Sequence, residues 1–411
     1  MDRRDAKSAY AILKPLEAER SGDPDFDYLL GIAALDSGRA TEAVFALERV
    51  LAVNPAHPQA RAEIARAYFV LGETTAAKRE FESVKSQQPP AEVQATIERF
   101  LDAINRLADT QQTSVAAYIE GTLGYDTNVN SGPGSSQVAI PAFGGAVATL
   151  NASGVKTADY FGSATAGVAL RHPLSKDVAL LAGLNLNKRV HQSEPEFNTG
   201  YWDANLGVAW TRGADVFTAA LQGNEFFLDG HRYREAYGIL GQWQRNIDAR
   251  NQVSAFGQYS QLRYADRADV QNSVRDANRS VAGVAYAHAF AGGTPVVFAS
   301  LYLGSEAERD STRPDLGHRL YGVRVGGQYS LNEKTFAFIN GNAERRKYGG
   351  PDAAFLTTRK DTQYNYAGGV TYSPAKGWKI TPQVSRTRNR SNIVINDFSR
   401  NIYSVTVRRD F

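Results

Sequence analysis

The chain ends with the stretch NIYSVTVRRDF, residues 401–411. Apolar and polar side chains alternate along it, one face holding Tyr403, Val405, Val407 and Phe411, the other Ser404, Thr406, Arg408 and Asp410. A period of two places successive side chains on opposite sides of a β-strand. The chain is therefore predicted to end in a strand with one apolar face, and its last residue is aromatic.

The same period recurs throughout residues 113–411. Segments of about ten residues alternate apolar with polar or small side chains, and turn residues separate them. They begin near Thr113, Asp159, Asp177, Gly200, Asp215, Arg232, Gln252, Arg279, Pro295, Arg319, Thr335, Thr362, Trp378 and Asn401. Their connections are short at one end, as at Leu331–Lys334, and long at the other, as at Asn130–Lys156. An even number of strands with this arrangement of loops predicts a 14-stranded antiparallel transmembrane β-barrel.

A soluble β-sandwich or propeller is the alternative for this segment. Its outer face would be polar, whereas both faces here are rich in aromatic residues, and several stand near segment ends, as do Tyr160, Trp202 and Trp378. Aromatic side chains of this kind gather at membrane interfaces. Closing the sheet into a barrel also removes the edge strands, which no helix in this segment could cover. The barrel is the preferred interpretation.

Residues 1–110 follow a different pattern, an internal repeat of 34 residues. Aligning 24–57 with 58–91 pairs Pro24 with Pro58, Gly38 with Gly72, Ala43 with Ala77 and Pro55 with Pro89. The glycines end the first helix of each unit and the later prolines stop the second. This period resembles the tetratricopeptide repeat and predicts an α-solenoid, with a small helical bundle as the alternative.

Solenoids of this type bind peptides or proteins in a concave groove. The groove residues expected to contact a partner are Tyr28, Leu30, Ala34, Ile64 and Tyr68.

Charge divides the chain at the same place. Residues 1–110 carry 14 Lys and Arg against 18 Asp and Glu, whereas residues 111–411 carry 32 against 25. The chain has no cysteine, which excludes disulfides, cysteine-ligated zinc and thiol nucleophiles. The predicted domains are an acidic helical unit, residues 1–110, and a basic barrel, residues 113–411.

Candidate chemistry is sparse, so neither an enzyme nor a bound cofactor or metal is expected. The six histidines lack the spacing of metal ligands. Asp126, Asn128 and Asn130 match half of a calcium-binding loop, but the glycine and distal glutamate of such a loop are missing. A turn at the end of a strand is the preferred interpretation. The polar faces of the predicted strands place four residues toward the lumen: Arg324, Gln328, Gln383 and Arg408.

The order of a tetratricopeptide array followed by a barrel resembles the Slam family of surface lipoprotein assembly modulators. So do the stretches Gly124–Asn130, Ser391–Ile393 and Tyr403–Phe411. The resemblance implies an outer-membrane translocator of Gram-negative bacteria, which moves a small lipoprotein or secreted protein from the periplasm to the cell surface. It implies further that the helical domain meets cargo or a chaperone in the periplasm, and that Phe411 is a signal for barrel assembly.

The expected partners are therefore the cargo protein, a periplasmic chaperone, the barrel assembly machinery and outer-membrane lipids. Nucleic acid is not expected, because the net charge is only +3. A polysaccharide-export or solute porin with a helical periplasmic adaptor is the alternative function, since a cationic lumen suits acidic sugars. A purely structural adhesin would leave the repeat groove without a purpose.

Overall fold

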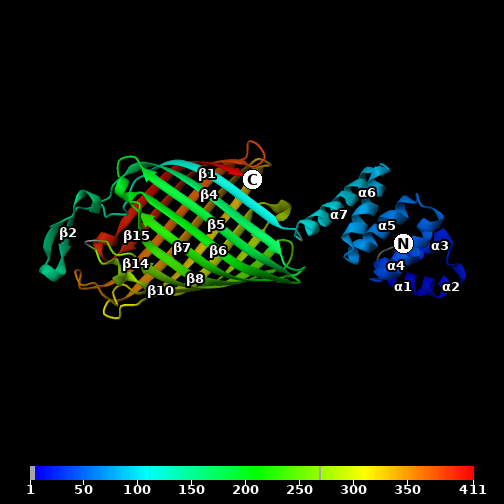
Figure 1. Cartoon of the computed structure of the whole chain (residues 1–411), viewed down its shortest axis with the longest axis horizontal. Helices are drawn as coiled ribbons and strands as arrows, with labels where there is room; N and C mark the ends of the chain where they lie inside the picture. The colour runs from blue at the N-terminus through cyan, green and yellow to red at the C-terminus, as the bar shows by residue number, and fades with distance from the viewer. Residues whose placement is uncertain (1–4, 111, 268–269) are drawn as a thin grey trace. The chain divides into compact units, whose positions relative to one another are not determined.

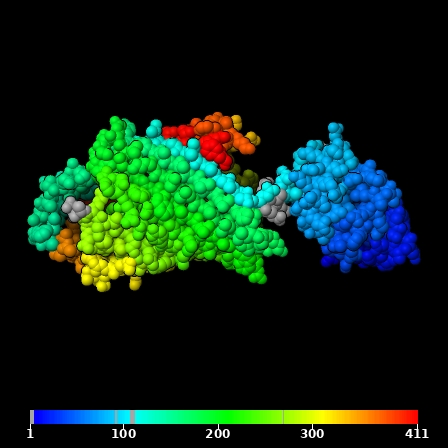
Figure 2. All heavy atoms as spheres, in the orientation of Figure 1, coloured from blue at the N-terminus to red at the C-terminus, as the bar shows by residue number. Residues whose placement is uncertain are grey.

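The computed structural model describes residues 5–110, 112–267 and 270–411. The chain forms two compact units, Met1–Thr113 and Ser114–Phe411 (Figures 1 and 2). The first unit is helical and the second is a closed antiparallel β-barrel, which confirms the predicted fold class. Residues 1–4 of the predicted helical domain lie outside the described residues.

The helical unit consists of helix pairs joined by tight turns. Its described helices are α1 (Ala6–Leu13), the 3-10 turn η2 (Lys14–Leu16), α2 (Glu17–Arg20), α3 (Pro24–Asp36), α4 (Ala40–Val53), α5 (Pro58–Val70), α6 (Thr74–Ser86) and α7 (Ala91–Thr110). Helix α3 pairs with α4, and α5 pairs with α6. Gly38 and Gly72 turn the chain inside these pairs with φ of 87° and 80°, which residues with a Cβ rarely adopt. Among the described residues, no helix is long and apolar enough to cross a membrane.

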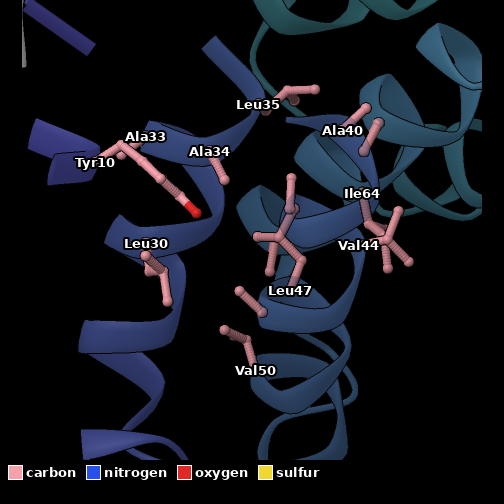
Figure 3. Close-up of a cluster of buried hydrophobic side chains, with 14 of the residues drawn as sticks. Tyr10, Leu30, Ala33, Ala34, Leu35, Ala40, Val44, Leu47, Val50 and Ile64 are labelled. Carbon is pink, nitrogen blue, oxygen red and sulfur yellow. The ribbon is translucent and has the colours of Figure 1, made fainter. Parts of the chain in front are cut away.

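A cluster of buried hydrophobic side chains fills the space between the helices of the first pair (Figure 3). Leu47 of α4 is fully buried. A Cβ at Gly31 of α3 would lie 2.7 Å from Leu47 Cγ, so glycine is required for this close approach of the two helices. The surrounding cluster includes Tyr10, Leu30, Ala33, Ala34, Leu35, Ala40, Val44, Val50 and Ile64. These residues form the core that joins consecutive repeats.

Glu42 of α4 is expected to contribute to the acid sensitivity of the helical unit. Its carboxylate accepts a hydrogen bond from the Tyr10 hydroxyl and lies 2.9 Å from Lys14 Nζ. These contacts, the Tyr10 bond first, lower the pKa of Glu42 from 4.5 to about 2. Because the pKa is depressed in the folded state, this stabilisation is complete above pH 4.5 and is lost as the pH falls toward about 2.

We therefore expect the helical unit to melt at a lower temperature as the pH falls through this window. Glu42→Gln is expected to flatten the dependence, and thermal melts followed by the helical circular dichroism signal would measure it. An equally steep dependence in the variant would assign the acid sensitivity to other groups.

In the described residues, fourteen strands form the barrel. They are β1 (Ser114–Asp126), β4 (Asp159–Pro173), β5 (Val178–His191), β6 (Thr199–Arg212), β7 (Asp215–Leu228), β8 (His231–Asn246), β9 (Asn251–Tyr264), β10 (Ala277–Ala289), β11 (Val296–Glu308), β12 (His318–Asn332), β13 (Thr335–Pro351), β14 (Thr358–Tyr372), β15 (Trp378–Ser391) and β16 (Phe398–Asp410). Each pairs with its neighbours in sequence, and β1 pairs with β16 to close the sheet. Each predicted segment corresponds to one strand, and the predicted starts differ from the observed ones by at most four residues.

Side chains alternate between a lipid-facing wall and the lumen. On β12, Tyr321, Val323 and Val325 are exposed on the outer face, whereas Arg324 contacts the lumenal Tyr302. Aromatic residues border the outer apolar band, as Trp378 does near the short turns. This arrangement is typical of a barrel surrounded by lipid.

The two ends of the barrel carry different loops. The turn between β6 and β7 is Gly213–Ala214, whereas residues 309–317 join β11 to β12. The connection between β1 and β4 contains a hairpin of β2 (Gln137–Ile140) and β3 (Ala146–Thr149) that the sequence analysis did not predict. Ser114, the first residue of β1, pairs with Arg171 next to the short β4–β5 turn, so the chain enters the barrel at its short-turn end. In outer-membrane barrels this end faces the periplasm.

Phe411 follows β16 at the closing seam. Its backbone N–H donates to the Ala117 carbonyl of β1 at 2.8 Å, and its ring is exposed and lies 5.5 Å from the Arg409 guanidinium carbon. We expect deletion of Phe411 to lower the amount of folded barrel in the outer membrane several-fold, because the deletion removes a closing hydrogen bond and the terminal aromatic ring. Transport per assembled molecule should be unchanged.

Heat-modifiable gel migration of outer-membrane fractions would measure this effect. Phe411→Trp is the matched control, since it keeps an aromatic ring at the terminus. Unchanged levels after the deletion would count against a role of Phe411 in assembly.

Candidate functional site

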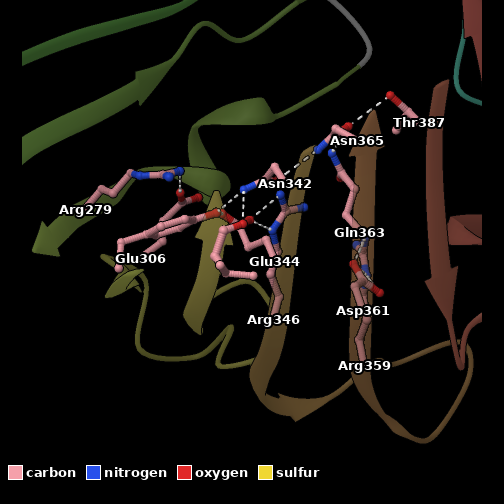
Figure 4. A network of polar contacts seen from close by, with 12 residues as sticks. Arg279, Glu306, Asn342, Glu344, Arg346, Arg359, Asp361, Gln363, Asn365 and Thr387 are labelled. Atoms are coloured by element: carbon pink, nitrogen blue, oxygen red, sulfur yellow. Dashed lines mark hydrogen bonds and ion pairs between the residues drawn. The ribbon is translucent and has the colours of Figure 1, made fainter. Parts of the chain in front are cut away.

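Inward-facing side chains form a continuous polar network in the barrel lumen (Figure 4). The hydroxyl of Tyr302 on β11 donates to Glu344 Oε2 at 2.9 Å and accepts from Asn342 Nδ2 at 2.8 Å. Arg346 Nε donates to the second oxygen of Glu344 at 2.6 Å. Asn365 on β14 extends the network by donating to Asn342 Oδ1 at 3.2 Å. The network therefore crosses neighbouring strands and stiffens this part of the wall.

Ion pairs are common among the charged side chains of the lumen. They include Arg279 with Glu306 at 3.3 Å, Arg346 with Glu344 at 2.6 Å, Arg359 with Asp361 at 2.7 Å, Lys379 with Asp410 at 2.8 Å and Arg408 with Asp410 at 2.7 Å. Each of these cations is matched by an acid on its own or a neighbouring strand. Much of the positive charge suggested by the sequence is therefore neutralised within the lumen.

The four residues predicted to face the lumen lie on three strands and do not form one cluster. Arg324 on β12 has its guanidinium carbon 4.8 Å from the Tyr302 ring centroid. The guanidinium carbon of Arg408 on β16 lies 3.6 Å from the Tyr118 ring centroid. Gln328, also on β12, and Gln383, on β15, occupy positions on the same inward face as these arginines.

Asp126, the last residue of β1, is the centre of an ion cluster at the outer mouth. Its side chain is fully buried. Arg400 of β16 donates from Nε to both carboxylate oxygens, at 3.0 and 2.9 Å, and its Nη2 contacts the same carboxylate. Arg189 Nη1 of β5 lies 3.8 Å from Asp126 Oδ2. Asp126 thus links the first strand of the barrel to the last one and to β5.

Asn128 and Asn130 fasten the loop that follows Asp126. The Asn128 backbone N–H donates to Asp126 Oδ1 at 3.0 Å, and its side-chain Nδ2 donates to the Ser399 carbonyl at 3.0 Å. Asn130 Nδ2 donates to the carbonyl of Val155 at 2.6 Å. The polar groups of Asn128 and Asn130 therefore make hydrogen bonds that hold the loop in place. In the described part of the chain, no group of three or more His, Cys, Asp or Glu could hold a metal ion.

The prediction of a cargo-binding groove is wrong for three of its five residues, because they are buried. Leu30, Ala34 and Ile64 are only 3%, 0% and 2% exposed and lie in the core between helices. The positions that recur most regularly in the repeat are those that pack the helices together. For this reason they cannot touch a partner.

Tyr28 and Tyr68 are partly exposed but contact different helices. The Tyr28 ring centroid lies 5.3 Å from that of His57, and burial followed by the nearby Glu63 raises the pKa of Tyr28. The Tyr68 hydroxyl donates to Glu48 Oε1 of α4 at 3.1 Å. Burial, followed by this hydrogen bond, raises the pKa of Tyr68 to about 12. The two tyrosines therefore have different contacts.

Helices α3 and α5 share a polar face that the sequence analysis missed. Arg66 Nη2 of α5 donates to Asp36 Oδ1 of α3 at 2.9 Å, and Arg66 also pairs with Glu63. Tyr28 is close enough to Glu63 and Arg66 for their charges to act on its hydroxyl. We call Tyr28, Asp36, Glu63 and Arg66 the α3–α5 face. The available signal was their helical spacing: Tyr28 and Asp36 are eight positions apart on α3, and Glu63 and Arg66 are three apart on α5.

Comparisons with known proteins match both units. The tetratricopeptide repeat family matches residues 34–100, and the family described as surface lipoprotein assembly modifier matches residues 118–411. A surface lipoprotein assembly modifier of Moraxella catarrhalis is 24% identical over 398 residues, covering 93% of this chain and 72% of the relative. Another, of Pasteurella multocida (strain Pm70), is 29% identical over 123 residues, covering 30% of this chain and 23% of the relative.

Among solved structures, the outer membrane protein OmpT of Vibrio cholerae aligns with 73% of this chain and 100% of its own, at 10% identity and a TM-score of 0.38.

Proposed function

This chain belongs to the surface lipoprotein assembly modifier family, and we propose that it delivers a small lipoprotein or secreted protein from the periplasm to the cell surface. The family match confirms the resemblance expected from the sequence. One observation carries the proposal: a tetratricopeptide unit and a closed, lipid-facing barrel are joined in one chain.

The barrel resides in the outer membrane. Only closed barrels and helices satisfy all backbone polar groups within lipid, and the outer face of this barrel carries an apolar band bordered by aromatic residues. Entry of the chain at the short-turn end agrees with a periplasmic helical unit.

We assign the α3–α5 face to recognition of cargo or of a chaperone that carries it. The face combines a partly exposed aromatic ring with two acids and an arginine. Tyrosine and arginine at the centre of an interface supply much of the binding energy in protein complexes. Cargo held there would then pass through or alongside the barrel lumen, where Arg324, Gln328, Gln383 and Arg408 lie.

The pairing of lumenal charges supports a translocator over a porin for acidic sugars. A conduit that attracts anions needs unpaired cations along its path, and several lumenal arginines are instead bound to acids. Single-channel recording separates the two functions: a large, stable pore that acidic oligosaccharides block would favour the porin.

The proposal is tested by surface display of a candidate lipoprotein encoded beside this protein. Cells lacking the protein should retain the lipoprotein inside, and the full chain should restore display. The barrel alone, residues 114–411, should insert without restoring it. Equal display with and without the protein would contradict the proposal.

Tyr28→Ala is expected to weaken cargo or chaperone binding at least about tenfold, because tyrosine is enriched among the interface residues whose truncation costs about 2 kcal/mol or more. The heat stability of the barrel should not change, since Tyr28 lies in the other unit. Val53→Ala, at an exposed position of α4, is the matched control. Binding to the purified full chain would measure the effect, and equal binding by both variants would remove Tyr28 from the recognition surface.

A further inference from the structure

A patch of basic side chains covers the lipid-facing side of β12–β15 near the long loops. This basic patch consists of Arg319, Arg345, Lys347, Lys360, Arg386, Arg388 and Arg390. Strand pairing places all of its members on the outward face that Tyr321 and Tyr366 share, and both of these tyrosines are exposed. The patch therefore points toward lipid and away from the lumen.

The strand register brings like charges side by side. Lys347 of β13 stands directly opposite Arg319 of β12 on one side and Lys360 of β14 on the other. Neighbouring strands are only about 4.8 Å apart. Like charges placed directly opposite each other destabilise a sheet, so this arrangement is unfavourable unless an anion neutralises it.

The protein supplies almost no such anion. Within the described residues, Arg388 has an ion pair, with Asp397 at 2.6 Å, and no other member of the basic patch has one. The outward positions of β12–β15 hold no Asp or Glu. At the same end of β8, by contrast, Arg232 is paired with Glu235 at 3.0 Å. Within the described residues, the cations without an ion pair are thus concentrated on the outward face of β12–β15.

The basic patch lies at the outer membrane–water interface. Toward the short turns, the same faces carry exposed apolar residues such as Val323, Ile339 and Val384. Tyrosines lie where the two regions meet, and the Arg390 guanidinium carbon is 5.8 Å from the Tyr364 ring centroid. Aromatic residues mark this interface, and cations on a lipid-facing wall are tolerated there but costly deeper in the membrane.

We propose that the basic patch binds the phosphate groups of lipopolysaccharide, the glycolipid of the outer leaflet. Arginine recognises phosphate through two parallel hydrogen bonds. Cations on four neighbouring strands face the same leaflet and, apart from Arg388, have no ion pair in the described residues. They match a lipid that carries more than one phosphate. The bound lipid neutralises the opposed cations and fixes the depth of this side of the barrel.

The test uses the purified full chain in phospholipid nanodiscs, with lipid A that carries both phosphates as the probe. The variant Arg319→Gln, Arg345→Gln, Lys347→Gln, Lys360→Gln should bind lipid A at least about tenfold more weakly. The control Lys176→Gln, Lys334→Gln, Lys376→Gln neutralises exposed lysines of the short turns and should bind like the parent. Heat-modifiable migration reports folding of every variant.

Further probes separate the sources of phosphate. Lipid A without phosphates should bind the parent as weakly as the four-site variant, and inorganic phosphate should not displace lipid A. Equal binding of lipid A to parent and variant would overturn the proposal. Phosphatidylglycerol binding as tightly as lipid A would also overturn it, because the patch would then be a general anionic-lipid surface.

A second measurement does not depend on the four-site variant. The double variant Lys347→Gln, Lys360→Gln removes two cations that stand directly opposite each other. Because their repulsion is then lost, the double variant should melt at a higher temperature than the parent in lipid-free detergent. Addition of lipid A should then stabilise the parent more than this variant. Equal stabilisation of the two would contradict the role of these lysines.

Discussion

Asp126→Ala is expected to lower the free energy of unfolding of the barrel by about 3 kcal/mol, because it leaves two arginines without their carboxylate. The lost contacts are those of Arg400 and Arg189, and they join β1 to β16 and β5. The effect falls at the lower end of the range for broken buried pairs, since the arginine side chains keep 22% and 25% exposure. Denaturant unfolding in lipid would measure it.

The same substitution should also release the outer loop, residues 127–158, to protease, because Asn128 loses the acceptor that orders its turn. Asp126→Asn keeps an acceptor for this turn and should protect the loop better. Arg232→Gln is the control: it breaks ion pairs with Glu235 and Glu225, but the Arg232 side chain is 53% exposed, so the loss should be no more than about 1 kcal/mol. If Asp126→Ala costs no more than this control, the cluster does not hold the closing seam.

Leu47→Ala is expected to destabilise the helical unit by about 2–5 kcal/mol, the usual cost of emptying a fully buried leucine site. Leu47 has no exposed surface and fills the space that Gly31 leaves open. For a unit of about 100 residues, each 1 kcal/mol lowers the melting temperature by about 4–8 °C. The helical circular dichroism signal should therefore melt at least about 8 °C earlier.

Phe45→Ala is the matched control for Leu47→Ala, since Phe45 lies on the same helix and is 59% exposed. It should change stability by no more than about 0.5 kcal/mol. The barrel should unfold at the same temperature in both variants, because the helices and strands form separate compact units. A lower barrel unfolding temperature in Leu47→Ala would mean that the two units unfold cooperatively.

Local patterns were sufficient to predict the architecture. Alternation in residues 401–411 and its recurrence located every barrel strand, because a wall between lipid and lumen imposes a period of two on each strand. The repeat of 34 residues predicted the helix pairs for a similar reason, since a small residue on one helix must meet a large one on the next, as Gly31 meets Leu47. The hairpin of β2 and β3 was missed because it lies in a loop, where no membrane imposes a pattern.

Sites that depend on long-range pairing could not be predicted in this way. Asp126 was singled out, but its partner Arg400 lies 274 residues away, and only closure of the barrel brings them together. Regular recurrence misled the choice of Leu30 and Ile64, because packing positions repeat more faithfully than surface positions. The basic patch could not be predicted, because its cations are known to lie side by side only when the register of four strands is known.

Reconstitution into liposomes offers the sharpest test of transport. Full-length protein is inserted with its helical unit inside, a lipoprotein is enclosed, and its exposure to external protease is followed over time. The proposed function predicts that the lipoprotein becomes accessible with the full chain and stays protected with the barrel alone, residues 114–411. Folding of the inserted barrel is verified first. Equal protection of the lipoprotein in liposomes with and without the full chain would then contradict the proposed function.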